Sequence, residues 1–145
     1  MDASNANLTL VQQQNDALNR GDIDAAAEFY AEDCRNHGRQ VGRAGVRAVL
    51  ADIKRTFPDA QFAVLDSVVD GDWVVIRCTF SGTHRGVGRR PINGGMLVGV
   101  QPTGRHFEVQ QIHMYQVQNG KITEHFANRD DLGMMQQLGL LPATK

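Results

Sequence analysis

One segment near the C-terminal end of the chain carries side chains whose types and spacing suit proton transfer. Between residues 109 and 118, strict alternation places Gln111, His113 and Tyr115 on one face of a strand. Imidazole donates or accepts a proton near neutral pH, and the amide and phenol beside it can hydrogen-bond a substrate oxygen. The same pattern also fits a histidine that only bonds across the sheet, so both interpretations stay open.

The turn that follows decides which residue faces His113 from the next strand. The dipeptide Asn119-Gly120 is a strong hairpin signal. A two-residue turn sets His113 against Phe126, whereas a three-residue turn with a left-handed glycine sets His113 against His125. We favour the three-residue turn, because it separates a face of imidazole and amide groups from a more apolar face.

Two acidic residues stand directly after the last strand candidate. Either Asp130 or Asp131 could supply a carboxylate base for an acid–base reaction. The same position suits the N-cap of a terminal helix, because acidic side chains accept hydrogen bonds from the free N–H groups there. One of the two residues could serve each purpose.

The histidines do not form a known metal-binding motif. Metal sites need three or more convergent His, Cys or carboxylate ligands, of which His113 and His125 could be two. No HxH, HxxxH or CxxC spacing supports such a site. The Gly-rich GVGRR segment is not followed by a helix and so does not fit a phosphate-binding loop. We therefore expect neither a metal nor a cofactor.

The elements that position these residues fall into two halves. Apolar residues recur at helical spacing in three segments of the first half, 8–18, 23–30 and 46–57. The second half alternates with period two over 61–69, 73–84, 105–118 and 121–128, and the chain closes with a short helix. Helices followed by antiparallel strands predict one α+β domain over residues 1–145, with the helices on one face of the sheet. Polar residues on the concave face indicate that part of the core is hollow.

Composition narrows the class of partner. The 145 residues include Lys+Arg 15 and Asp+Glu 16, which leaves a net charge of −1 and no field to hold nucleic acid. The apolar stretches are far shorter than the roughly 20 residues that cross a bilayer. The N-terminal segment has no basic or apolar region of a secretory signal, so a cytoplasmic location is expected. The expected partner is a small or uncharged molecule.

Several motifs occur in a fixed order along the second half. They are a Gly-x-x-Pro-Thr-Gly-Arg turn, a QxH strand, an NGKI hairpin and a terminal QLG helix. Together with the opening ALNRGDIDAAAEFYAEDCRNHG, they resemble the SnoaL-like polyketide cyclases from about Leu10 to Gly139. The resemblance implies the nuclear transport factor 2-like (cystatin-like) cone, in which a curved antiparallel sheet wraps around N-terminal helices. It also implies an enzyme without a cofactor that acts on a hydrophobic polycyclic or ketone-bearing small molecule.

The resemblance also implies a pocket. In these cyclases, an aspartate on the last strand is the acid/base of an intramolecular aldol ring closure, and a His, a Gln and an Asn complete the site. The His and Gln match His113 and Gln111, and the Asn matches Asn36. The aspartate position falls on Ala127, which cannot abstract a proton. Ring closure by that residue is therefore excluded.

Several hypotheses for the function of the site follow from the alanine at position 127. We expect His113, assisted by Asp130 or Asp131, to act as acid/base on a substrate held by Asn36, Gln111, Tyr115 and His125 beside Ala127. Other readings are epoxide opening, double-bond isomerisation, a hydroxylation-associated role, or a binding protein without chemistry. A purely structural dimer is the weakest, because polar residues on a concave face cost stability unless a ligand or water satisfies them.

The opposite face of the same two strands predicts self-association. Ile112, Met114, Ile122 and Phe126 make this convex face too apolar for bulk water. We expect it to form a homodimer interface by sheet-to-sheet contact.

Overall fold

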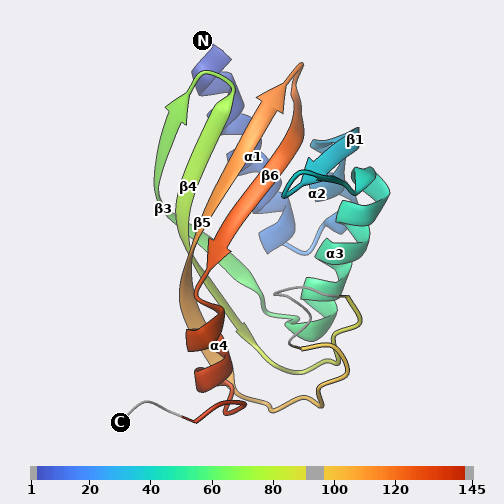
Figure 1. The fold of residues 1–145 in the computed structure, drawn as a ribbon, viewed down its shortest axis with the longest axis vertical. Coiled ribbons are helices and arrows are strands. Elements are labelled where there is room, and N and C mark those ends of the chain that lie inside the picture. Colours follow the sequence, from blue (N-terminus) through green and yellow to red (C-terminus); the bar gives the residue numbers. More distant parts are fainter. Residues whose placement is uncertain (1–2, 91–96, 143–145) are drawn as a thin grey trace.

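The computed structural model describes residues 3–90 and 97–142. In this part of the chain, helices and strands alternate irregularly before a run of long strands (Figure 1). The helices are α1 (Ala3–Asn19), α2 (Ile23–Glu28), α3 (Gly42–Thr56) and α4 (Asp131–Gln137). The strands are β1 (Tyr30–Asn36), β2 (Arg39–Gln40), β3 (Gln61–Asp70), β4 (Trp73–Thr83), β5 (His106–Gln118) and β6 (Lys121–Arg129).

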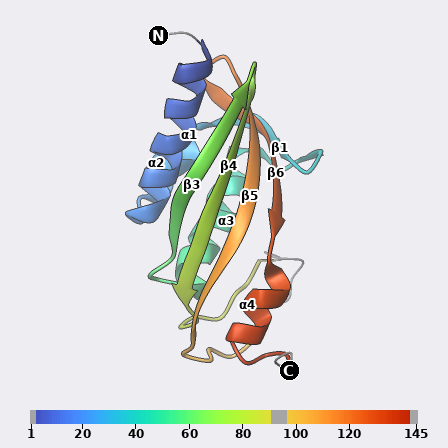
Figure 2. The same cartoon turned by 90° about the vertical axis from the view of Figure 1, so that its left-hand side faces the viewer.

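The described strands form one sheet in the order β2-β1-β6-β5-β4-β3. Helices α1, α2 and α3 lie on one side of this curved sheet, and α4 lies beyond its end (Figures 1 and 2). The predicted α+β fold is confirmed. The sheet is antiparallel as expected except at one pair, in which β1, a strand that was not predicted, runs parallel to β6. The chain leaves α2 beside Ile122 and continues along β6 in the same direction, so this pair has no hairpin to make it antiparallel.

The predicted helices and long strands form close to where the periodicity placed them, except that the helix predicted over 23–30 ends at Glu28 and Tyr30 begins β1. Asp22 caps α2 by accepting a hydrogen bond from the Ala25 N–H at 3.1 Å. Helix α3 ends at Thr56, two residues before Pro58, which disfavours a helical residue ahead of it. The short strands β1 and β2 were not predicted. In β1 only Tyr30 and Cys34 are fully buried, so the strand has no alternating pattern to reveal it.

The β5–β6 hairpin corrects the favoured register. Asn119 and Gly120 both have positive φ, at 53° and 72°, and form a two-residue turn that pairs Gln118 with Lys121. A bulge then shifts the pairing by one residue, so that His113 lies opposite Ala127 rather than His125 or Phe126. The three-residue turn was therefore wrong, and the two-residue alternative holds only next to the turn.

The same bulge corrects the predicted convex face. Ile122 lies before the bulge, on the inner face, and is fully buried. Ile112 and Met114 are exposed on the outer face as expected, and Phe126 is half-buried opposite Met114. One extra residue in β6 thus moves the start of that strand to the other face of the sheet.

Two apolar clusters fill the space between the sheet and the helices. The first is built around Phe57, Phe62, Phe80 and Phe107. The second contains Val11, Tyr30, Cys34, Val74, Ile76, Tyr115, Val117 and Ile122. The rings of Phe62 and Phe80 stack with their centroids 4.4 Å apart. Members of both clusters also line a cavity between the sheet and α3.

Candidate active site

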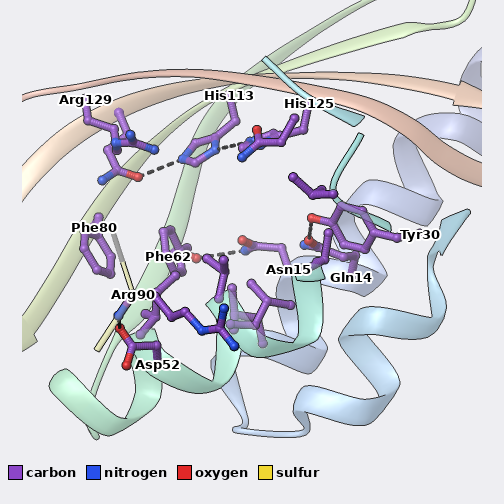
Figure 3. Close-up of a pocket in the computed structure, with 18 of the residues that line it drawn as sticks. Gln14, Asn15, Tyr30, Asp52, Phe62, Phe80, Arg90, His113, His125 and Arg129 are labelled. Atoms are coloured by element: carbon purple, nitrogen blue, oxygen red, sulfur yellow. Dashed lines mark hydrogen bonds between the residues drawn. The ribbon is translucent and has the colours of Figure 1, made fainter. Parts of the chain in front are cut away.

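A cavity of about 380 Å³ separates the inner face of the sheet from helix α3 (Figure 3). Helix α3 contributes an apolar wall of Val46, Val49, Leu50 and Ile53. The sheet contributes Ile76, Phe80, Gln111, His113, Tyr115, His125 and Arg129. A volume in the range of roughly 300–1,000 Å³, with mostly apolar walls and a few polar groups, is typical of small-molecule sites.

Four of the predicted site residues form one hydrogen-bonded chain on the sheet wall. His113 Nδ1 lies 2.9 Å from His125 Nε2, and His113 Nε2 lies 2.7 Å from Gln111 Oε1. His125 Nδ1 lies 3.0 Å from Asn36 Oδ1. Although β5 and β6 pair His113 with Ala127, His125 is the diagonal neighbour on the same face and comes within reach. The sheet therefore brings these residues together by a register that differs from the predicted one.

Burial keeps the two imidazoles neutral. Desolvation, with a smaller contribution from the Arg129 charge, lowers the pKa of His113 to about 4. Desolvation also holds the pKa of His125 well below its usual value, and neighbouring His113 adds to this effect. Two neutral imidazoles supply two N–H donors, whereas three hydrogen bonds link the chain. One amide end must therefore turn its NH₂ toward an imidazole, and the chain of donors runs in a single direction.

Tyr115 and Ala127 complete this wall around the histidines. The Tyr115 ring packs against His125 with centroids 4.8 Å apart and stacks on His113 at 6.1 Å. Burial holds the pKa of Tyr115 well above its usual value, so its hydroxyl keeps its proton. Ala127 lies directly across from His113, and its N–H donates to His37 Nε2 at 3.2 Å. Ala127 thus presents only a methyl group beside His113.

The two aspartates after β6 are not among the described residues that line the cavity. Asp130 caps α4 by accepting a hydrogen bond from the Gly133 N–H at 2.9 Å. Asp131 lies 3.8 Å from Arg129 Nε, and burial raises the pKa of its carboxyl. The helix-cap alternative therefore describes Asp130, and neither carboxylate is placed to touch a molecule in the cavity.

Three functional candidates were missed by the sequence reasoning. Arg129 extends the polar face of β6 past Ala127, but the predicted strand stopped at residue 128. Arg90 comes from the Gly- and Arg-rich segment, where no periodicity shows orientation. Asp52 lies four residues before Thr56 on the buried side of α3 and is completely buried. An aspartate within an apolar helical stripe was the one signal available in advance.

The described residues offer no metal site of the ordinary kind. In residues 3–90 and 97–142, no three His, Cys, Asp or Glu side chains converge closely enough to hold an ion. None of the helices in these ranges is long and apolar enough to span a membrane.

A curved sheet that encloses a helix-backed cavity also occurs in known structures. TsrD from Streptomyces laurentii superposes with a TM-score of 0.80 at 30% sequence identity, over 97% of this chain and 99% of that one. The family model for the SnoaL-like polyketide cyclases matches residues 9–138. The chain therefore belongs to the SnoaL-like polyketide cyclase family.

Relatives of similar sequence identity carry the names of cyclases. The chain is 30% identical over 139 residues to the aklanonic acid methyl ester cyclase DauD of Streptomyces sp. (strain C5), covering 91% of this chain and 81% of the relative. It is also 30% identical over 129 residues to the nogalonic acid methyl ester cyclase of Streptomyces nogalater, covering 85% and 90%.

Proposed function

We propose that this protein is an acid–base enzyme that closes a ring in a ketone-bearing, mostly apolar small molecule, with His113 moving the proton. One observation carries the proposal. A neutral, buried imidazole lies on the wall of the cavity, hydrogen-bonded on one side to Gln111 and on the other to His125. Buried imidazoles held by partners on both sides are suited to positioned proton transfer.

The direction of the hydrogen-bonded chain decides whether His113 can accept a proton. When His125 donates from Nδ1 to Asn36 Oδ1, its Nε2 accepts the Nδ1–H of His113. The Nε2 atom of His113 then carries the lone pair, and the Gln111 amide must present its NH₂ to it. In this arrangement His113 is a base, and His125 and Asn36 position it.

The chemistry needs only groups of this chain. The carbonyl oxygen of the substrate accepts a hydrogen bond from the Gln111 amide, and the movement of Gln111 uncovers His113 Nε2. The adjacent C–H gives its proton to Nε2, and its electron pair forms an enolate. The enolate carbon attacks a second carbonyl of the same molecule, and the new alkoxide takes the proton back from His113. The negative charge of the enolate raises the pKa of His113 during the reaction, which favours the first transfer.

Isotope exchange tests this step without requiring the ring to close. In deuterated water, the protein should catalyse exchange of the C–H beside a ketone, with aklanonic acid methyl ester as the first probe because relatives act on it. His113→Gln should lower the exchange rate by about 10²–10⁴-fold. The matched control is His106→Gln, which changes an exposed histidine of the same strand outside the cavity. Full exchange by a folded His113→Gln protein would remove His113 from the mechanism.

A second function is favoured by Ala127. The residue opposite His113 has no ionisable group, so the cavity could bind a small molecule and perform no chemistry. Ala127→Asp would distinguish the two functions. If this variant gains ring closure that the wild-type protein lacks, the wild-type cavity is a binding site; if the wild-type already catalyses exchange, the enzyme proposal holds.

We further propose a homodimer formed through the outer face of the sheet, and a cytoplasmic location. A row of apolar residues crosses four strands on this face, from Val68 through Val75 and Met114 to Phe126. Val68 is 67% exposed, which is unusual for a valine within a sheet. Free, buried thiols at Cys34 and Cys78 are in keeping with a reducing compartment.

A further inference from the structure

The charges around the cavity are unbalanced. Three arginines line it among the described residues, Arg35, Arg90 and Arg129, against a single carboxylate, Asp52. The two histidines of the cavity wall are held neutral by burial and add no charge of their own. A cavity whose remaining walls are mostly apolar therefore carries an excess of positive charge.

Asp52 does not offset this excess, because its carboxylate is already engaged. Its Oδ1 accepts from the Arg55 guanidinium at 2.6 Å and from the Arg89 N–H at 3.0 Å, and its Oδ2 accepts from the Arg90 N–H at 3.1 Å. The side chain is completely buried. Asp52 thus anchors the backbone at Arg90, and the Arg90 side chain runs from there into the cavity (Figure 3). Because this buried carboxylate accepts hydrogen bonds from two consecutive backbone N–H groups, it fixes the position of the loop at Arg90.

Arg129 has no adequate partner of its own. Its Nε is buried and forms no hydrogen bond with any described residue. The nearest carboxylate oxygen, on Asp131, is 3.8 Å from that nitrogen, which is too far for a hydrogen bond. The positive charge of Arg129 also contributes to the low pKa of His113 and His125. A buried guanidinium nitrogen without a hydrogen-bond partner lowers stability, and an anion bound in the cavity would supply that partner.

Arg35 and Arg90 lie where the cavity meets solvent. Both residues are exposed, and neither forms an ion pair with a carboxylate of the described chain. Such side chains attract an anion toward the opening, and Arg129 then meets it farther inside. The part of the lining formed by the buried residues Tyr30 and Gln14, by contrast, is neutral: the Tyr30 hydroxyl donates to Gln14 at 2.6 Å.

We infer that the ligand of this cavity is a free carboxylic acid on an apolar, ring-bearing frame, with its carboxylate on Arg129 and its frame against α3. The inference rests on the proposed function only for the choice of cavity. A planar guanidinium pairs with a carboxylate through two parallel hydrogen bonds, whereas a neutral ester offers no charge to it. The relatives named above are, by name, cyclases of methyl esters. The ligand inferred for this chain differs in one group, which is a free carboxylate here and a methyl ester there.

Matched acid and ester pairs test the inference directly. The probes are aklanonic acid with its methyl ester and 1-hydroxy-2-naphthoic acid with its methyl ester, with binding measured by titration calorimetry. In at least one pair, the acid should bind about tenfold or more tightly than the ester. Arg129→Gln should abolish the preference by weakening only the acid. Arg77→Gln is the control, because Arg77 pairs with Asp66 on the outer face of the same sheet.

Two further measurements exclude a general response to charge. Inorganic phosphate should fail to displace the bound acid at equal concentration, because it has no frame to place against α3. The acid, but not the ester, should raise the pH at which His113 titrates by NMR. The inference is overturned if no acid is preferred over its ester, if Arg129→Gln keeps the preference, or if phosphate competes equally.

This test separates the inference from the proposed function. Exchange on the neutral methyl ester probes His113 and does not require Arg129 to hold an anion. Acid-selective binding without exchange would leave the inference standing for a binding protein. Exchange on acid and ester with equal binding would leave the enzyme standing and overturn the inference.

Discussion

The two faces of the β5–β6 hairpin reverse the usual distribution of side chains. On the inner face, Gln111 and His113 are only 4% and 8% exposed, although both are polar. On the outer face, their neighbours Ile112 and Met114 are 49% and 37% exposed, although both are apolar. Along this strand, the polar side chains are therefore buried and the apolar side chains between them are exposed to solvent.

Neither face of the hairpin has the distribution of side chains that would make a monomer most stable. A buried polar group lowers stability unless hydrogen bonds replace its water, and the inner face meets this requirement with the chain from Gln111 to Asn36. Exposed apolar side chains contribute little to the stability of a monomer. They contribute free energy when a partner covers them and removes their surface from water. The burial of polar residues on the inner face therefore supports the proposed ligand site, and the exposure of apolar residues on the outer face supports the proposed interface.

A charge placed on the inner face should have the largest effect on stability. His113→Lys puts an ammonium group beside Arg129, and the one carboxylate among the described residues that line the cavity, Asp52, is already bonded to Arg55. We expect the free energy of unfolding to fall by about 3–5 kcal/mol. Urea unfolding at pH 7 measures this change. A loss below about 1 kcal/mol would mean that His113 is not in a dry environment.

Low pH should also lower the free energy of unfolding, by slightly less than the His113→Lys substitution does. The pKa of His113 is about 4 in the folded chain against 6.5 for the free side chain, so between these values the unfolded chain binds a proton that the folded chain does not. Stability is therefore complete above about pH 6.5 and falls as the pH drops toward 4, by about 3 kcal/mol from this residue. Urea unfolding from pH 7 to pH 4 should show this slope. His113→Gln should make this slope shallower and leave the share of His125, whose pKa burial also lowers, whereas His106→Gln should keep the full slope. An equal slope in both variants would contradict the assignment.

Removal of one hydrogen-bond partner of His113 should lower the free energy of unfolding by a still smaller amount. His125→Ala leaves His113 Nδ1 without its partner at 2.9 Å and opens a small cavity. We expect a loss of about 1–3 kcal/mol. In a double-mutant cycle with Asn36→Ala, the two losses should not add, because both remove links of one chain. Strict additivity in thermal or urea unfolding would show that the links are independent.

The sequence predicted the fold and this face wherever residue types alone determine the outcome. Gln111, His113 and Tyr115 share a face because they are two residues apart in a strand, whatever the register. The helices follow from apolar stripes and from the cap at Asp22. The network to His125 and Asn36 was within reach of the sequence only as a group of candidates.

Other features depend on tertiary contacts that the local pattern does not encode. The bulge after Ile122 adds one residue to β6, and no side chain there signals it. The parallel pairing of β1 with β6 joins segments nearly 90 residues apart, as in the contact of Asn36 with His125. Arg129 and Arg90 enter the site from a strand end and from a loop, where alternation no longer indicates direction.

A charge on the outer face should change stability least and association most. Met114→Lys places its ammonium group in water in the monomer, so we expect the monomer's free energy of unfolding to change by less than about 0.5 kcal/mol. In the proposed dimer, however, the two-fold axis would bring the same substitution from both subunits together on one apolar face, and the charges would lose water. Wild-type protein should sediment as a dimer at high micromolar concentration, and Met114→Lys as a monomer. Exchange at the inner face should persist, because Met114 points away from His113. A wild-type monomer at that concentration would leave the outer face without its proposed partner, whereas loss of exchange in a folded Met114→Lys monomer would show that the two faces are coupled.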